Sequence, residues 1–305
     1  MDGLLVIDKP PGPTSHDVVA RMRRVLGERR IGHTGTLDPA ASGVLPLVLG
    51  RATRLARFLS GANKSYEAVV RFGFATDTYD FEGRAVGERS TDPMPARDQI
   101  ESALEAFRGS FDQQPPAFSA KKIDGQRSYV AARASRAASP ARPAHPTLPA
   151  PVRVTVYAAD IVDAAADCVT LHLTCSAGFY VRSLAHDLGV RLGVGAHLAG
   201  LRRTASAGLT LADAIALDVA EGSRDRAIAA IVPLERMLSG LSSVVLTEAG
   251  VERAQHGRDI GAADMATGES AAPPPVRLFD QRGQLIGIAE PAAVPGLLHP
   301  SVVLM

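Results

Sequence analysis

The chain has 305 residues, of which 46% are hydrophobic and 21% charged, and its formal net charge is +1 at pH 7. This size predicts two domains, or one large domain with a small one. No apolar run reaches the roughly 18 residues that a membrane helix needs. The N-terminal sequence MDGLLVIDKP has neither the basic flank nor the apolar stretch of a secretory signal. We therefore expect a cytoplasmic protein that does not interact with membranes.

The cysteine content is low, consisting of Cys168 and Cys175 alone. These residues are too far apart for a CxxC pair, and no metal-binding set surrounds them. We interpret both as small core residues in a reducing compartment. The sequence predicts neither a metal site nor a disulfide framework.

Arginine is concentrated near the N-terminus, although the net charge is close to zero. Eight arginines lie between residues 21 and 57, against two acidic residues, Glu28 and Asp38. Clustered arginine is typical of proteins that bind phosphate backbones. A solvated helix face gives the same pattern, so both interpretations stay open on charge alone.

Apolar periodicity and turn residues predict a mixed succession of strands and helices in the first half of the chain. In chain order we expect a strand at 4–8, a helix that starts at Thr14 or Ser15 and ends at Gly27, a glycine-rich loop at 32–43, a strand at 44–49, a short basic helix at 52–59, a strand at 64–74, a turn at 80–83 and an amphipathic helix at 98–108.

The composition changes at 131–151, which is almost all Ala, Ser, Arg and Pro and predicts a flexible loop or insertion. Strand patterning resumes at 152–157 and 169–175, and a helix follows from about 182 to 192. After residue 209 the chain reads as helical and alanine-rich. A boundary at 239–243 predicts a large domain at 1–240 and a small β-rich module at 245–305. In the module we expect one helix after Thr247 and a hairpin at 276–289.

The segment at 32–46, GHTGTLDPAASGVLP, is the densest chemical signal. It places one carboxylate, Asp38, in a glycine-rich loop between the apolar residues Leu37 and Val44. Glycines allow a substrate to approach the backbone, and a carboxylate in such a loop can act as a covalent nucleophile. The same residue could instead form an Asx turn before Pro39. The loop by itself does not separate the two roles.

Five segments, in this order, resemble the TruB family of tRNA pseudouridine synthases over residues 3–217, with weaker similarity to the C-terminus. They are GLLVIDKPPG at 3–12 followed by Thr14-Ser15, the loop at 32–46, Lys64-Ser65-Tyr66 leading to Thr76-Asp77-Thr78, CSAGFYVRSL at 175–184 with Asp187-Leu188-Gly189, and the weaker SAKK at 119–122 with Gly125 and Tyr129.

This resemblance implies roles for five residues. Asp38 matches the catalytic aspartate of the family, and Arg182 matches the arginine that pairs with it. Tyr66 matches the active-site tyrosine, whose ring can stack on uracil and whose hydroxyl can transfer a proton. Tyr180 matches an aromatic residue near the base, and His33 matches a histidine that fills the space left by a flipped base. Isomerisation needs no redox step and no hydrolysis, so we expect no cofactor and no metal.

Several basic residues are candidates for phosphate contacts in this framework. An alternative for Lys9 is that it braces the loop of the site. The set consists of Lys9, Lys64, Arg21, Arg24, Arg30 and Lys122.

The family implies an α+β fold with a mixed, largely antiparallel central sheet and flanking helices, the pseudouridine synthase fold. The module at 245–305 resembles a PUA-type RNA-binding domain. The implied substrate is uridine 55 in the T loop of tRNA, and we expect a monomer without a protein partner. Ala177 and Phe179 depart from the usual family residues, which affects local packing at most.

Three other functions remain as alternatives. A carboxylate glycosidase would need a second acid next to Asp38, whereas the resemblance pairs Asp38 with Arg182 and tyrosines. A non-catalytic tRNA folding chaperone could use the same fold. A synthase for a different RNA site would share every motif.

Overall fold

The computed structural model describes residues 1–119, 122–123, 126–127, 148–267 and 275–304. The chain divides into two compact units. Unit 1 consists of Met1–Asp38, Leu45–Ser60 and Ala212–Met305, and unit 2 of Pro39–Val44 and Gly61–Leu211. The predicted loop at 131–151 lies outside the described residues except for its last four positions. The predicted division into 1–240 and 245–305 stays a prediction.

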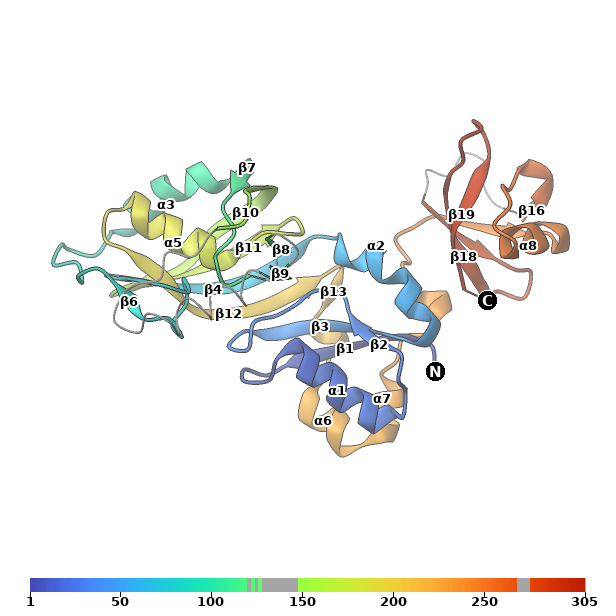
Figure 1. Ribbon diagram of the computed structural model, residues 1–305, viewed down its shortest axis with the longest axis horizontal. Helices are drawn as coiled ribbons and strands as arrows, with labels where there is room; N and C mark the ends of the chain where they lie inside the picture. The colour runs from blue at the N-terminus through green and yellow to red at the C-terminus, as the bar shows by residue number, and fades with distance from the viewer. Residues whose placement is uncertain (120–121, 124–125, 128–147, 268–274, 305) are drawn as a thin grey trace. The chain divides into compact units, whose positions relative to one another are not determined.

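The N-terminal part of unit 1 is a small sheet with helices beside it. Strand β1 (Gly3–Lys9) lies between β14 (Ile215–Ala216), which runs parallel to it, and β3 (Ser42–Leu49), whose last residues pair with β2 (Ile31–His33). Helix α1 (Ser15–Leu26) packs against α6 (Leu217–Gly222) and α7 (Arg224–Ala229) (Figure 1).

The ends of α1 follow from its sequence. Thr14 is the N-cap and forms a capping box with Asp17, and Gly27 closes the helix with φ of 68°. Val18, Val19, Met22 and Leu26 are buried at helical spacing. The predicted helix is confirmed, and Thr14 takes the capping role that the sequence also offered to Ser15.

The C-terminal part of unit 1 is a five-stranded sheet in the order β16-β15-β17-β18-β19. Helix α8 (Glu248–Gln255) is capped by Thr247 and packs against this sheet. Apolar residues from the strands and from α8 form one core. The small β-rich module predicted from the sequence is therefore present. Its strands are β15 (Ser243–Leu246), β16 (Met265–Thr267), β17 (Val276–Phe279), β18 (Leu285–Pro291) and β19 (Leu298–Val303).

Unit 2 is built on a mixed sheet that is mostly antiparallel. Its order is β12-β4-β11-β10-β7, and the first residues of β3 add to β12 in parallel. Helices α3 (Arg97–Leu104) and α5 (Val181–Arg191) lie side by side over this sheet (Figure 1). The α+β class with a large mixed sheet is confirmed. The antiparallel strands are β4 (Lys64–Phe72), β7 (Gly109–Gln113), β10 (Val152–Ala165), β11 (Cys168–Cys175) and β12 (Ala196–Ser206).

Two predictions for the second half of the chain were incomplete. The long strand β12 was not predicted, because Gly200, Arg202 and Arg203 interrupt the alternation of apolar residues. The helical reading after residue 209 holds only for the short helices α6 and α7 and for single turns at Leu211–Asp213 and Leu234–Arg236.

The remaining elements are short. They are the turn Gly50–Leu55, helix α2 (Ala56–Ser60), the turns Glu105–Phe107 and Ala262–Asp264, and the strands β5 (Ala75–Thr76), β6 (Ala85–Val86), β8 (Lys122–Ile123), β9 (Gln126–Arg127) and β13 (Leu209–Thr210).

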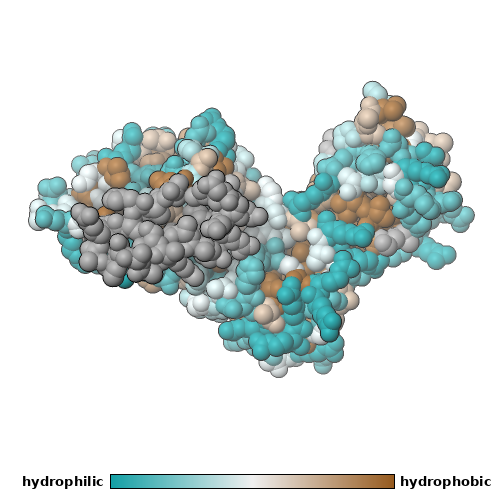
Figure 2. Space-filling model, viewed as in Figure 1, coloured by the Kyte–Doolittle hydropathy of each residue, from teal (hydrophilic) through white to brown (hydrophobic). Residues whose placement is uncertain are grey.

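The surface visible in Figure 2 is mostly hydrophilic, and the two cysteines are not paired with each other. On the face shown in Figure 2, hydrophilic residues predominate and hydrophobic ones gather in small patches. Within the described ranges, no helix is long and apolar enough to cross a membrane. Both cysteines are free thiols: Cys175 is buried, and Cys168 is half-buried.

Candidate active site

The carboxylate of Asp38 follows a segment of backbone that one buried hydroxyl holds. Ser15 is 1% exposed, and its Oγ accepts a hydrogen bond from the backbone N of Leu37 at 2.9 Å. The same hydroxyl donates to the carbonyl oxygen of Leu37 at 3.1 Å. Both backbone groups of the residue before Asp38 are thus fixed from α1. Sequence reasoning missed this role of Ser15, although Thr14-Ser15 belongs to the first matched segment.

Lys9 and His33 lie in the same unit as Asp38. The Lys9 side chain is fully buried, and its Nζ donates to the carbonyl oxygens of Pro10 and Pro13 at 2.9 and 2.8 Å. An ammonium held in this way braces its own turn, which favours the bracing role over a phosphate contact. His33 ends β2 and meets the ring of His16 edge-on, with 5.3 Å between the ring centroids.

Arg182 of unit 2 is a buried cation near the start of α5. The residue is 6% exposed. Its guanidinium donates to the carbonyl oxygens of Thr78 at 3.2 Å and Phe118 at 2.9 Å. The carboxylate of Asp80 lies 3.7 Å away. These partners fix the plane of the guanidinium, and sequence reasoning did not identify them. The pairing of Arg182 with Asp38 stays a prediction.

Tyr180 is held by the amide of a buried glutamine. The Gln113 side chain accepts a hydrogen bond from the backbone N of Tyr180 at 2.8 Å and donates to its carbonyl oxygen at 3.0 Å. Next to it, the hydroxyl of Ser183 donates to the carbonyl oxygen of Gln114 at 2.7 Å. The end of β7 thus fixes the backbone that precedes Arg182. No sequence pattern singled out Gln113, because its partner is distant along the chain.

Tyr66 lies on β4 between two buried basic side chains. Tyr66 and Lys64 are each 8% exposed, and Arg203 is 1% exposed. Arg203 lies directly opposite Tyr66 in the register of β12 with β4 and forms a hydrogen bond with its phenol. Burial lowers the pKa of the Arg203 guanidinium from its ordinary value, and the Tyr66 hydrogen bond opposes that change.

Lys64 is also fixed within the protein. Its Nζ donates to the carbonyl oxygen of Ala62 at 2.6 Å. Burial, followed by the like charge of Arg203, lowers the pKa of Lys64. A buried ammonium with a carbonyl partner is a poor candidate for a phosphate contact, because a phosphate must reach it from solvent.

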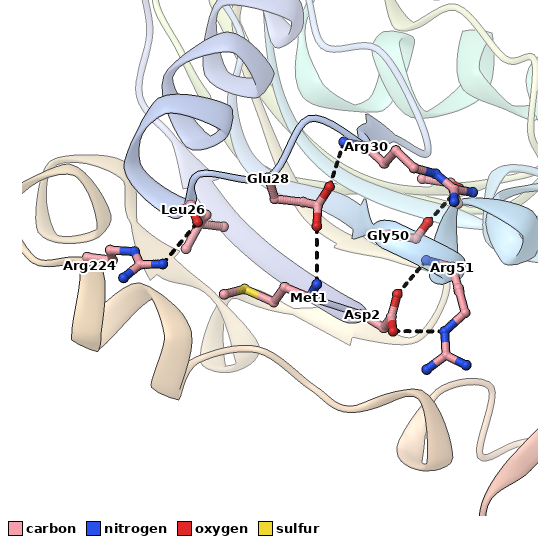
Figure 3. Close-up of polar contacts among 9 residues, drawn as sticks. Met1, Asp2, Leu26, Glu28, Arg30, Gly50, Arg51 and Arg224 are labelled. Atoms are coloured by element: carbon pink, nitrogen blue, oxygen red, sulfur yellow. Dashed lines mark hydrogen bonds and ion pairs between the residues drawn. The ribbon is translucent and has the colours of Figure 1, made fainter.

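The arginines at 21–57 divide into two groups. Several bind other parts of unit 1: Arg51 pairs with Asp2 at 2.8 Å (Figure 3), Arg54 donates to the carbonyl oxygen of Val303, and Arg57 pairs with Glu290 at 2.7 Å. These contacts give much of the cluster a structural role.

Three of the arginines in this cluster were predicted to contact phosphates, and they are partly or fully exposed. Arg21 forms a partly exposed ion pair with Glu221 at 3.4 Å, whereas the side chains of Arg24 and Arg30 are exposed. The backbone of Lys122 lies in β8, and its side chain is outside the described part of the protein. Among the side chains that the structure describes, no group of three or more His, Cys, Asp and Glu could hold a metal ion.

Two family models match most of the chain. The N-terminal domain of the TruB family pseudouridylate synthases matches residues 23–181, and the C-terminal domain of tRNA pseudouridylate synthase B matches residues 182–239. A buried arginine, a strand tyrosine and an aspartate loop therefore occur here in the context of an RNA-modifying isomerase. The chain belongs to the TruB family, whose members are pseudouridine synthases.

Curated relatives extend the match to the full length. A tRNA pseudouridine synthase B of Solibacter usitatus is 44% identical over 306 residues, which cover 100% of both chains. Another, from Synechococcus elongatus, is 41% identical and covers 99% of this chain and 98% of the relative. A third, from Ralstonia nicotianae, is 40% identical, with coverage of 98% and 92%.

Solved structures give the same fold. A chain from an H/ACA RNP bound to a substrate RNA containing 2'-deoxyuridine aligns with a TM-score of 0.72 and 25% identity. A chain from a Cbf5-Nop10-Gar1 complex aligns with a TM-score of 0.72 and 27% identity. Both alignments cover 99% of this chain and 85% of the other. The pseudouridine synthase fold expected from the sequence is confirmed.

Proposed function

We propose that this chain converts uridine 55 in the T loop of tRNA to pseudouridine, with Asp38 as the covalent nucleophile. The observation that carries the proposal is the clamp on Leu37, which fixes the backbone directly before a half-buried carboxylate in a glycine-rich loop. Full-length relatives at 40–44% identity that are named tRNA pseudouridine synthase B support the substrate class.

The chemistry needs one nucleophile and ordered acid–base groups. The uridine leaves the loop stack and enters the site, and His33 takes the space that it leaves. The Asp38 carboxylate attacks C1′ of the ribose or C6 of the base. The glycosidic C–N bond breaks, the base turns, and C5 forms the new bond to C1′. The bond between Asp38 and the substrate breaks, C5 loses its proton and N1 gains one. Substrate and product therefore contain the same atoms, Asp38 is regenerated, and no cofactor or metal takes part.

The other side chains orient these groups. Arg182 pairs with Asp38 and holds its carboxylate in place. The ring of Tyr66 stacks on uracil, and its hydroxyl lies ready for proton transfer. Tyr180 packs against the base from a backbone that Gln113 fixes.

Binding of the T arm uses basic residues. Arg21, Arg24, Arg30 and Lys122 contact phosphates, while Lys9 braces the turn of β1. The module at 245–305 acts as a PUA-type RNA-binding domain. The protein works as a cytoplasmic monomer on tRNA and needs no protein partner.

The decisive experiment maps pseudouridine on an unmodified tRNA transcript incubated with wild-type protein and with Asp38→Asn. We expect modification at the T-loop uridine with wild type only. Binding of the tRNA by Asp38→Asn should stay within about tenfold, or about 1.4 kcal/mol. Asp112→Asn is the matched control, because this carboxylate is 65% exposed and forms only a surface pair with Arg153.

Each other result points to a different function. Pseudouridine formed by Asp38→Asn contradicts the nucleophile assignment. Modification outside the T loop indicates another RNA target, and release of free uracil indicates a glycosidase. Binding with no modification on any tRNA, together with tRNA folding that survives in Asp38→Asn, indicates a folding chaperone.

A further inference from the structure

Arg203 is a buried cation that neither the motifs nor the proposed mechanism assigns. It lies within β12 and is 1% exposed, which makes it one of the largest fully buried side chains of the protein. Burial of a guanidinium is costly unless nearby groups accept its hydrogen bonds. The groups that accept them here therefore indicate what the residue does.

One acceptor belongs to the segment that continues from Asp38. The Nε of Arg203 donates to the carbonyl oxygen of Val44 at 2.7 Å. Where β12 pairs with β3, Arg203 lies opposite Gly43. A Cβ at Gly43 would come within 2.1 Å of the Arg203 carbonyl oxygen. Gly43 also has φ of 101°, a backbone conformation that side chains disfavour. The main chain and the side chain of Arg203 together hold this end of the loop tightly against β12.

The second acceptor is the phenol of Tyr66. Arg203 and Tyr66 lie opposite each other on β12 and β4, and the guanidinium forms a hydrogen bond with the phenolic oxygen. Because arginine has donors only, the hydroxyl proton of Tyr66 must point away from Arg203. The positive charge also stabilises any negative charge that develops on this oxygen.

We propose that Arg203 is a positioning residue for the isomerisation, which joins the Tyr66 hydroxyl to the Val44 end of the Asp38 loop. This inference rests on the proposed function, since it assigns Arg203 to the same site. One buried guanidinium then sets two things together: the direction in which Tyr66 presents its hydroxyl and the position at which the loop meets the sheet. Arg203 itself does not touch the substrate.

The first test compares the rate of the chemical step with binding and stability in Arg203→Lys. Lysine keeps the charge but lacks the planar fork that reaches two acceptors. We expect the single-turnover rate on tRNA to fall by about 100-fold, the cost of a small misplacement of a reacting group. The dissociation constant for tRNA should change by less than about threefold, or about 0.7 kcal/mol, because Arg203 does not touch the substrate. Arg71→Lys, an exposed arginine of β4 paired with Asp167, is the matched control and should keep the wild-type rate.

The second test is a double-mutant cycle with Tyr66→Phe, which removes the phenol oxygen and keeps the ring. If Arg203 acts through that oxygen, the two losses are not additive. We expect the fold-decrease in single-turnover rate caused by Arg203→Lys to be at least about tenfold smaller in the Tyr66→Phe background than in the wild-type background, because the two residues share one network. Rates are measured in single turnover with enzyme in excess, so that slow variants remain measurable.

Three results would overturn the proposal. They are a wild-type single-turnover rate in Arg203→Lys, a wild-type rate in Tyr66→Phe, and additive losses in the double variant. If Arg203→Lys loses its cooperative unfolding, Arg203→Gln, which keeps a planar donor group, replaces it in the cycle with Tyr66→Phe, and additive losses again overturn the proposal. Failure of the proposed function looks different: the wild type and Arg71→Lys then form no pseudouridine, and the assignment of Arg203 falls with it.

Discussion

The polar groups that hold the candidate site differ in kind between the two units. In unit 1 a neutral hydroxyl, that of Ser15, fixes the backbone before Asp38 through Leu37. In unit 2 the buried guanidinium groups of Arg182 and Arg203 donate to carbonyl oxygens and to a phenol. Neutral hydrogen bonds cost little to bury, whereas a buried charge is tolerated only while its partners remain in place. The position of Asp38 therefore depends on weak neutral hydrogen bonds. The positions of Tyr66 and Arg182 depend on buried charges, whose desolvation cost is offset by their hydrogen-bond partners.

The largest expected effect on stability follows from removal of a buried charge. Arg182→Ala leaves the carbonyl oxygens of Thr78 and Phe118 and the carboxylate of Asp80 without this partner. Breaking such a buried set costs about 3–5 kcal/mol, and urea denaturation should show this loss together with loss of turnover. Arg71→Ala removes a surface ion pair and should cost about 0–1 kcal/mol. Equal losses of stability in the two variants would contradict a large stabilising role for the buried charge of Arg182.

The neutral clamp should give a smaller effect on stability. Ser15→Ala leaves the buried N and O of Leu37 without the hydroxyl, which costs about 1–3 kcal/mol. The single-turnover rate should fall as well, because the backbone before Asp38 is less well fixed. Ser110→Ala deletes an exposed hydroxyl that bonds Thr155 and serves as the control. A wild-type rate in Ser15→Ala would mean that the clamp serves folding alone.

The smallest effect concerns a carboxylate of α5 and appears as pH dependence. Burial raises the pKa of Asp187 from 3.8 to about 6. Below pH 4 this carboxyl is protonated in both the folded and the unfolded protein. Between pH 4 and 6 the unfolded chain releases the proton first, so the stability falls as the pH rises, and the loss is complete above pH 6.

Asp187→Asn should remove this pH dependence. Because the side chain is only partly buried, we expect the variant to be more stable than wild type by about 1 kcal/mol at pH 7. The two proteins should converge near pH 4. Denaturant titrations between pH 4 and 8 measure the difference, and Asp112→Asn, on the surface, should leave the curve unchanged. A constant difference at every pH would show that Asp187 acts through packing.

Much of the architecture could be predicted because each of several elements carries its own local signal. The alternation of Val169, Leu171 and Leu173 predicts β11, and the spacing in α1 predicts a buried face that ends at Gly27. Strand β12 was not predicted because Arg203 occupies a buried position at which strand alternation normally places an apolar residue. Its burial depends on Tyr66 and Val44, which lie far away along the chain.

In the candidate site, too, only the features with a local sequence signal could be predicted. Asp38 stands out in the sequence because glycines and a proline surround it within one loop, but its role as nucleophile follows from the family resemblance and stays a proposal. The supporting contacts could not, since Ser15 resembles a helix cap and Gln113 resembles an ordinary strand residue. Each acts through a backbone group that only the tertiary fold brings near. The residue types in the sequence therefore indicate the chemistry, whereas the hydrogen-bond partners of these residues are known only from the folded structure.

The two thiols of β11 also determine how the protein can be labelled. Burial raises the pKa of Cys175 to about 12 and leaves it 1% exposed, so that maleimide reagents in neutral buffer have neither access nor thiolate to react with. Cys168, at the other end of the same strand, is only half-buried. The unaltered sequence thus offers one accessible thiol, on a strand of the central sheet of unit 2, as the attachment point for a fluorophore.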